Sequence, residues 1–311
     1  MIKYVCRLIR LPNVIFVAVF QILLRYGIIL PQLANAGIEP ALTTAQFILL
    51  VLATTALTAS GNVINDYFDV NVDKINRPER VIVGNTLDRR TVLLIHVILT
   101  FLGVVCGFYI ALRLHKELYA FVFIIVPVLL WFYSSLFKKH FLIGNLVVAI
   151  LTAATAWIVA STEFAALVLH HGHNITSNAA CETAWLYCNV YACFAFLMNA
   201  IREIVKDMED AEGDAACGCR TLPVEMGYGR SKSIVMLLST LLVICILTAF
   251  LNSSRLQSNE VLGWAFVAAI IVTITISNII TLHAQEPKQY HKASTLLKVA
   301  MGIGVATIIL L

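Results

Sequence analysis

Two groups of three aspartates have the same spacing in the sequence, three residues and then four. They are Asp66, Asp69 and Asp73, and Asp207, Asp210 and Asp214. Positions i, i+3 and i+7 share one face of a helix, so each group predicts a stack of carboxylates. Asn62 extends the first stack by one turn. Mg²⁺ takes oxygen ligands and typically combines one or two carboxylates with substrate phosphates. The two groups therefore predict a magnesium site that binds a phosphate.

Basic residues accompany both aspartate groups. They are Arg77 and Arg80 after the first group, Arg202 and Lys206 before the second, and Arg220 after it. A guanidinium binds phosphate oxygens in a fixed fork, whereas a lysine acts as a point charge. Carboxylates interleaved with cations are what a metal–diphosphate complex requires. The alternative is that these charges form surface ion pairs on solvated loops. The same aspartate spacing in two places favours a metal–diphosphate site over that alternative.

The elements that must position these residues are membrane-spanning helices. The chain is 60% hydrophobic and only 13% charged, with a mean hydropathy of +0.87. A soluble domain carries about twice that charged fraction. A spanning helix needs about 20 mostly apolar residues. Nine segments qualify, at about 11–30, 45–65, 91–112, 118–137, 142–161, 184–205, 233–251, 261–282 and 294–311. The sequence predicts an all-α polytopic membrane protein in one domain, 1–311, with motif loops at about 62–90 and 202–232.

The basic residues predict how the chain crosses the membrane. Of the 22 Lys and Arg residues, Arg25 and Lys298 fall within spans. With the N-terminus in the cytoplasm, only Arg113, Lys116 and Arg255 fall on the opposite side, and the other 17 are cytoplasmic. This positive-inside bias predicts a cytoplasmic N-terminus and an external C-terminus, with both aspartate groups facing the cytoplasm. A cleaved signal peptide is the alternative for the first span, although Gln21 interrupts its apolar run.

Cysteines and histidines form two further clusters. Cys217 and Cys219 enclose one glycine, which is not a C-x-x-C redox or zinc spacing. His170, His171 and His173 lie together in the long segment between the fifth and sixth spans. A solvated loop is the favoured interpretation of the histidines, with metal binding as the alternative.

The motifs resemble those of the UbiA-type intramembrane prenyltransferase superfamily. Asn65–Asp73 (NDYFDVNVD) fits its N-D-x-x-D-x-x-x-D signature, and Ile75–Gly84 is similar to the continuation of that motif. Arg202–Asp214 (REIVKDMEDAEGD) resembles the second aspartate motif, and Thr221–Gly227 (TLPVEMG) its usual sequel. Arg7–Asn13 and Gly144–Ala149 are similar to the family's first and fifth spans. The resemblance therefore runs through most of the chain in order.

The resemblance implies nine helices around a central cavity, with a cytoplasmic cap formed by the two motif loops. It implies two Mg²⁺ ions, one held by Asn62, Asp66, Asp69 and Asp73 and one by Asp207, Asp210 and Asp214. It implies diphosphate binding by Arg77, Arg80 and Lys206, together with Arg202, Lys138, Tyr133 and Asn13. The implied reaction moves a polyprenyl group, expected to be geranylgeranyl, from its diphosphate to a lipid-soluble acceptor. Membrane lipids are the expected surroundings, in the plasma (inner) membrane, and no nucleic acid is expected.

The second motif looks most like the branch of digeranylgeranylglyceryl-phosphate synthase-like members, which implies geranylgeranylglyceryl phosphate as the acceptor. An aromatic acceptor of quinone biosynthesis, of the 4-hydroxybenzoate or dihydroxynaphthoate type, is the alternative. An ion-coupled transporter is a rival of another class, but its acids would lie at mid-membrane rather than at span ends. An alcohol phosphotransferase would carry its aspartates in one continuous motif. A structural membrane scaffold is a further rival, in which the aspartates would lie at helix ends without a chemical role.

Overall fold

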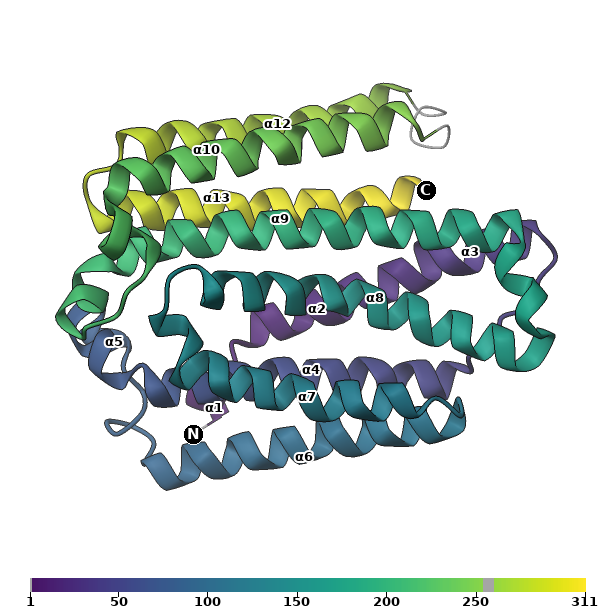
Figure 1. The fold of residues 1–311 in the computed structure, drawn as a ribbon, viewed down its shortest axis with the longest axis horizontal. Coiled ribbons are helices and arrows are strands. Elements are labelled where there is room, and N and C mark those ends of the chain that lie inside the picture. The colour runs from purple at the N-terminus through teal and green to yellow at the C-terminus, as the bar shows by residue number, and fades with distance from the viewer. Residues whose placement is uncertain (1, 254–259) are drawn as a thin grey trace. The chain divides into compact units, whose positions relative to one another are not determined.

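The computed structural model describes residues 2–253 and 260–311, and its regular elements are helices (Figure 1). Arg255, expected on the external side, lies outside the described residues. Among the described residues, nine helical segments are long and apolar enough to cross a membrane. The first combines α2 (Leu11–Leu23), η1 (Leu24–Ile29) and α3 (Leu30–Asn35). The others are α4 (Thr44–Phe68), α6 (Arg89–Arg113), α7 (Glu117–Ser135), α8 (Ile143–His171), α9 (Ala179–Ala216), α10 (Leu222–Leu251), α12 (Glu260–His283) and α13 (Pro287–Ala306). The prediction of an all-α protein with nine spans is confirmed.

Short helices lie between and beside these spans. They are α1 (Ile2–Leu8), α5 (Val70–Asn76), η2 (Pro78–Arg80), η3 (Phe137–Lys139), η4 (His173–Ser177) and η5 (Thr307–Leu310). Several spans begin at residues that satisfy the first backbone amides of a helix. The hydroxyl of Thr43 accepts from the amide of Gln46, whose side chain accepts from the Thr43 amide. This reciprocal pair is a capping box, which starts α4 at Thr44.

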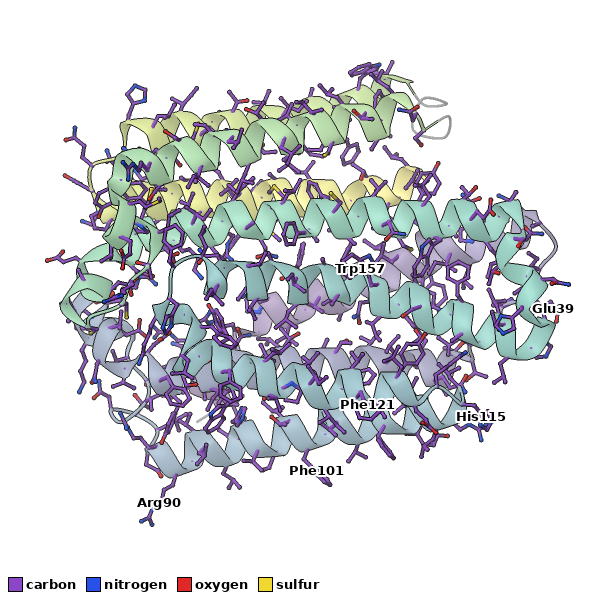
Figure 2. The ribbon with its side chains drawn as sticks, in the orientation of Figure 1. Glu39, Arg90, Phe101, His115, Phe121 and Trp157 are labelled. Carbon is purple, nitrogen blue, oxygen red and sulfur yellow. The ribbon has the colours of Figure 1, made fainter. Side chains whose placement is uncertain are left out.

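The described residues form two compact units, and the first holds the chain up to Phe137 together with Trp157–Trp185. In this unit α6 packs along α4 and α7. A side chain at Gly107 would meet the ring of Phe123 at 2.1 Å, so this close approach requires glycine. On the opposite side of α6, Phe101 is 70% exposed and points outward (Figure 2). Large apolar side chains exposed in this way suit a lipid-facing surface.

A buried ion pair ties together three segments of the first unit. Arg25 in η1 donates from Nε to Oε2 of Glu163 in α8 at 2.8 Å. Arg25 also donates to the Leu42 carbonyl, and the Leu42 amide donates to Glu163. A charge inside a membrane span is costly unless it is paired. The pairing explains how Arg25 is accommodated within the first span.

The second unit holds Lys138–Ala156 and Leu186–Leu311. Its core is formed by buried side chains of α9, α10, α12 and α13, including Met198, Ile201, Leu242 and Leu297. Helix α9 has 38 residues, or about 57 Å at 1.5 Å per residue. About 20 residues are enough to span the hydrocarbon core. The carboxyl-terminal part of α9 therefore extends well beyond the length that a span requires.

Element boundaries differ from the expected ones where polar residues continue a helix. The span expected at 184–205 is the central part of α9. The polar residues that follow this span stay helical as far as Ala216. Likewise α4 ends at Phe68, and α5 follows after Asp69. Both segments expected as motif loops, at about 62–90 and 202–232, are therefore largely helical. The single-domain organisation of 1–311 stays a prediction.

Candidate active site

The first aspartate group lies across the junction of two helices. Asp66 is in the last turn of α4, Asp69 joins the two helices, and Asp73 is in α5. The amide of Asp69 donates to the Asn65 carbonyl at 3.0 Å, and the amide of Asp73 donates to the Asp69 carbonyl at 2.8 Å. These i to i−4 bonds continue the helical register through the junction. The carboxylates therefore follow one another at helical spacing, as the sequence predicts.

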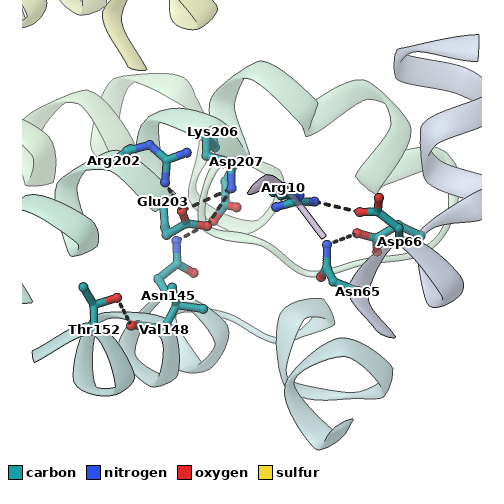
Figure 3. A network of polar contacts seen from close by, with 11 residues as sticks. Arg10, Asn65, Asp66, Asn145, Val148, Thr152, Arg202, Glu203, Lys206 and Asp207 are labelled. Atoms are coloured by element: carbon teal, nitrogen blue, oxygen red, sulfur yellow. Dashed lines mark hydrogen bonds and ion pairs between the residues drawn. The ribbon is translucent and has the colours of Figure 1, made fainter. Parts of the chain in front are cut away.

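The segment that joins α1 to α2 contacts this group. Nη2 of Arg10 donates to Oδ1 of Asp66 at 2.8 Å (Figure 3). Nδ2 of Asn62 donates to the Ile9 carbonyl at 2.9 Å, one turn before Asp66. Arg10 has a left-handed backbone, with φ of 51°. This bend at the start of the first span turns the chain where Arg10 meets the acidic group. Arg10 is absent from the residues that sequence reasoning selected.

Asn65 is a second residue that sequence reasoning left out of the site. Its Nδ2 donates to Oδ2 of Asp69 at 2.7 Å (Figure 3). Its Oδ1 is buried and has no hydrogen-bond partner among the described residues. An unsatisfied buried polar atom is costly, so a cation or a donor from a ligand would stabilise this oxygen. The available signal was its place as the first letter of the N-D-x-x-D motif.

The second group lies on one uninterrupted helix, α9. Glu203 gathers both cations predicted to bind diphosphate in this region (Figure 3). Its carboxylate accepts from Nη1 of Arg202 at 2.8 Å and from Nζ of Lys206 at 2.9 Å. The Glu203 side chain is only 9% exposed. Nε of Arg202 is buried with no partner among the described residues. Glu203 therefore holds a cationic pair one turn before the second aspartates.

Helices α8 and α13 add partners to the second group. Nδ2 of Asn145 in α8 donates to Oδ2 of Asp207 at 2.7 Å (Figure 3). Asn145 belongs to the Gly144–Ala149 stretch, but sequence reasoning assigned it no role. His291 in α13 lies 3.0 Å from Oε1 of Glu209. These contacts fix α9 against two neighbouring helices at the level of its acidic segment.

The remaining predicted residues are divided between the two units. The first unit holds Asn13 in α2, Arg77 directly after α5, Arg80 in η2 and Tyr133 in α7. The side chain of Arg80 lies outside what the structure describes. The second unit holds Lys138 in η3. Each unit therefore combines one aspartate group with its own candidate diphosphate-binding residues.

The Cys217–Cys219 segment follows the second group directly. The amide of Cys219 donates to the Asp214 carbonyl at 2.9 Å. Cys217 is exposed, whereas Cys219 is buried. Burial, together with the nearby Asp214 carboxylate, raises the pKa of the Cys219 thiol. A raised pKa keeps the thiol protonated at neutral pH, so Cys219 is not a ready nucleophile or metal ligand.

The donor atoms near both groups suit a hard cation. Within either unit, no three His, Cys, Asp or Glu side chains of the described residues already converge on a metal position, and this includes the histidines at 170–173. Instead, Asp66, Asp69 and Asp207 each accept a hydrogen bond from a nitrogen. The accepting atoms are carboxylate oxygens, and in the first unit Asn65, which contacts Asp69, adds an unsatisfied amide oxygen. Oxygen ligands of this kind, taken in each unit by itself, fit Mg²⁺.

Known proteins are similar to this chain in sequence along most of its length. The sequence model of the UbiA prenyltransferase family matches residues 28–299. The digeranylgeranylglyceryl phosphate synthase of Thermococcus kodakarensis is 32% identical over 283 residues, which cover 91% of this chain and 90% of the relative. That of Pyrococcus horikoshii is 33% identical over 285 residues, with the same coverage of both chains.

A solved structure has the same fold. The UbiA homologue from Archaeoglobus fulgidus bound to DMAPP and Mg²⁺ superposes with a TM-score of 0.57 at 17% identity, covering 98% of each chain. At this identity the likeness concerns the fold. The resemblance seen in the motifs is thus confirmed by relatives that cover most of the chain. This chain belongs to the UbiA prenyltransferase family and is an integral membrane prenyltransferase.

Proposed function

We propose that this chain is a digeranylgeranylglyceryl phosphate synthase. It transfers a geranylgeranyl group from geranylgeranyl diphosphate to the free hydroxyl of geranylgeranylglyceryl phosphate. The observation that carries this proposal is that relatives of that name are 32% and 33% identical to the chain over nine-tenths of both sequences. The positive-inside bias of the sequence supports a reaction on the cytoplasmic side, and we assign the protein to the plasma membrane.

We assign two Mg²⁺ ions to the aspartate groups. One is held by Asn62, Asp66, Asp69 and Asp73, and the other by Asp207, Asp210 and Asp214. The binding of DMAPP and Mg²⁺ by the A. fulgidus homologue supports a magnesium–diphosphate site. Bound Mg²⁺ neutralises the negative charge that develops on the diphosphate leaving group. The hydrogen bond from Asn62 to the Ile9 carbonyl uses the amide nitrogen and leaves the oxygen for the ligand role.

The cations around the two groups bind the diphosphate oxygens. Glu203 holds Arg202 and Lys206 in place, and the positioned pair donates to diphosphate oxygens when substrate binds. The unsatisfied Nε of Arg202 supplies one further donor. Arg77, Arg80 and Lys138 add positive charge, and Tyr133 and Asn13 add polar contacts. Preorganised donors aimed at a developing negative charge are among the largest contributions to catalysis.

The bond changes follow from this arrangement. The bond between the prenyl C1 and the diphosphate oxygen breaks, and its electron pair leaves with the diphosphate. The resulting allylic cation is attacked by the hydroxyl oxygen of the acceptor, which forms the ether bond. The hydroxyl proton passes to the released diphosphate. Apolar side chains of the spans exclude water, which would otherwise convert the cation to a prenyl alcohol.

A product analysis tests this proposal. The purified protein is incubated with Mg²⁺, geranylgeranyl diphosphate and one of three acceptors: geranylgeranylglyceryl phosphate, 4-hydroxybenzoate or dihydroxynaphthoate. We expect a phosphorylated diether and one diphosphate per ether bond, measured by mass spectrometry and a diphosphate assay. If the main product is a prenylated aromatic compound, the enzyme is instead assigned to quinone biosynthesis. The absence of any magnesium-dependent diphosphate release would reject both.

A further inference from the structure

A shallow groove opens in the second unit where α9 ends and α8 begins. Its volume is ≈510 Å³, which lies in the range of small-molecule sites. Three basic side chains line it, from Arg220, Arg230 and His140. We call this hollow the basic groove. Arg220 accompanies the second aspartate group in the sequence, but the aspartate contacts described above involve neither its side chain nor that of Arg230.

Two features of the backbone form the basic groove. The Arg220 amide donates to the Lys139 carbonyl at 2.8 Å, which joins the segment after α9 to the segment before α8. Gly227 interrupts α10 with φ of 77° and ψ of 164°, a conformation that L side chains rarely adopt. The interruption separates the first turn of α10, with Glu225 and Met226, from the turn that carries Arg230. The concavity therefore depends on a glycine at this position.

The charge of the basic groove favours an anion. Among the described residues, its lining contains one acidic residue, Glu225, whose Oε1 lies 3.6 Å from Nε of Arg220. The side chains of this pair are 42% and 77% exposed. An exposed ion pair of this kind contributes little free energy, so an incoming anion displaces it at little cost. Two guanidinium groups offer the forked donors that match phosphate oxygens.

The other wall of the basic groove is apolar. Phe141, Ile143 and Met226 line it, and all three are solvent-accessible. Ile143 is the first residue of the spanning helix α8, so the groove lies at the end of a span. Phosphate headgroups of lipids lie at this level of a bilayer, where basic side chains attract them. A soluble phosphate needs no apolar wall, whereas a lipid phosphate brings apolar groups with it.

We propose that the basic groove binds the phosphate headgroup of the acceptor lipid and sets the preference for a phosphorylated acceptor. This inference rests on the proposed function and adds a headgroup site to it. Arg220, which lines the basic groove, lies close in the chain to the second aspartate group. The amide of its neighbour Cys219 donates to the Asp214 carbonyl. Anionic lipids of the bulk membrane share the same headgroup chemistry, so the test separates these two sources.

The test compares wild-type protein with the double variant Arg220→Gln/Arg230→Gln in nanodiscs of zwitterionic lipid. We expect the KM for geranylgeranylglyceryl phosphate to rise about 10- to 100-fold, because the variant loses the charge-assisted hydrogen bonds from both guanidinium groups to the phosphate. The KM for geranylgeranyl diphosphate and the KM for the dephosphorylated acceptor geranylgeranylglycerol should stay within about twofold of wild type. Lys288→Gln, which removes an exposed cation of α13 outside the groove, is the matched control.

Direct binding makes the inference independent of catalysis. Native mass spectrometry of the wild type should show retention of geranylgeranylglyceryl phosphate over geranylgeranylglycerol, and the double variant should lose that preference. Glu225→Gln should keep or strengthen it, because both arginines remain. A double variant that behaves like Lys288→Gln in both measurements overturns the inference. A KM effect that occurs only when the nanodiscs contain anionic lipid overturns the acceptor assignment in favour of bulk lipid.

The two proposals fail in different ways. If the wild type makes no phosphorylated diether, the proposed function fails in the product analysis. The native mass spectra then decide the groove by themselves, because they require no turnover. If the diether forms and the double variant keeps its acceptor KM, the proposed function stands and the headgroup site is rejected.

Discussion

The two aspartate groups share their spacing but differ in what holds them. The first lies across the junction of α4 and α5 and is contacted by Arg10, which is 56 residues away from Asp66 in sequence. The second lies within the continuous helix α9, and its cations are held by Glu203, a neighbour on the same helix. Equal spacing therefore does not mean equal construction.

This difference indicates how each group responds to change. The cationic pair of the second group depends on contacts with residues of α9 within one turn of Glu203, at i−1 and i+3. The Arg10 contact of the first group requires the chain before α2 to pack against α4. The first group therefore depends more on tertiary packing, and the second depends more on local helix formation.

The largest effects should come from the carboxylates themselves, and they should be equal in the two groups. Asp69→Asn and Asp210→Asn each remove one negative charge without changing side-chain size. We expect kcat to fall about 10²–10³-fold in each variant, the cost of removing one electrostatic contact to the transition state. Diphosphate release at saturating Mg²⁺ measures it. Retention of full activity by either variant would mean that its group has no part in the reaction.

The next effect should be specific to the second group. Glu203→Gln keeps the size of the side chain but cannot hold two cations. We expect the KM for prenyl diphosphate to rise about 10- to 100-fold, as is typical when a supporting group behind a binding residue is lost. The KM for the acceptor should change little. Glu225→Gln is the matched control, and an equal rise in that variant would count against a positioning role for Glu203.

A weaker pair of effects should have opposite signs in the two groups. The neutral Asn145 orients Asp207, so Asn145→Ala should raise the Mg²⁺ concentration for half-maximal activity about tenfold. The charged Arg10 competes with a cation for Asp66, so Arg10→Gln should lower it. Magnesium titrations of the initial rate measure both. Shifts in the same direction would remove the distinction between an orienting and a competing partner.

The smallest effect should be a pH dependence confined to the helix that follows the first group. Hydrogen bonds from the Thr91 hydroxyl and amide hold the pKa of the Asp88 carboxyl below its ordinary value of 3.8. The folded pKa is the lower one, so this capping stabilisation is present above pH 3.8. It is lost as the pH falls through the folded pKa. The protection factors of amides in the first turn of α6, which are intrinsic hydrogen-exchange rates divided by the observed rates, should therefore fall in acid.

Asp88→Asn provides the control for this pH effect, because it keeps an acceptor without a titrating charge. Its protection factors in the first turn of α6 should show no such fall in acid. The helix that follows the second group, α10, begins at Leu222 after the N-cap residue Thr221, whose side chain makes no capping hydrogen bond. Its first turn should show no such pH dependence, and an equal response there would contradict the cause given for α6.

The sequence by itself determined the class of this protein and the chemistry of its acidic groups. Long apolar runs specify spanning helices because an unsatisfied backbone is excluded from lipid. Aspartates at i, i+3 and i+7 specify a shared helix face because that relation depends only on helix geometry. Both are local properties of the chain, and so both could be predicted from residue order.

Only the tertiary structure decided which partners meet the aspartates. Arg10 with Asp66, Asn145 with Asp207 and the Lys139–Arg220 contact join residues far apart in sequence. Composition and periodicity place no constraint on such pairs, because they form through the packing of helices, for which several crossing angles are available. The basic groove likewise requires the break at Gly227 and the end of α9 at Ala216. Only folding brings Arg220 and Arg230 to the same groove as its apolar side chains.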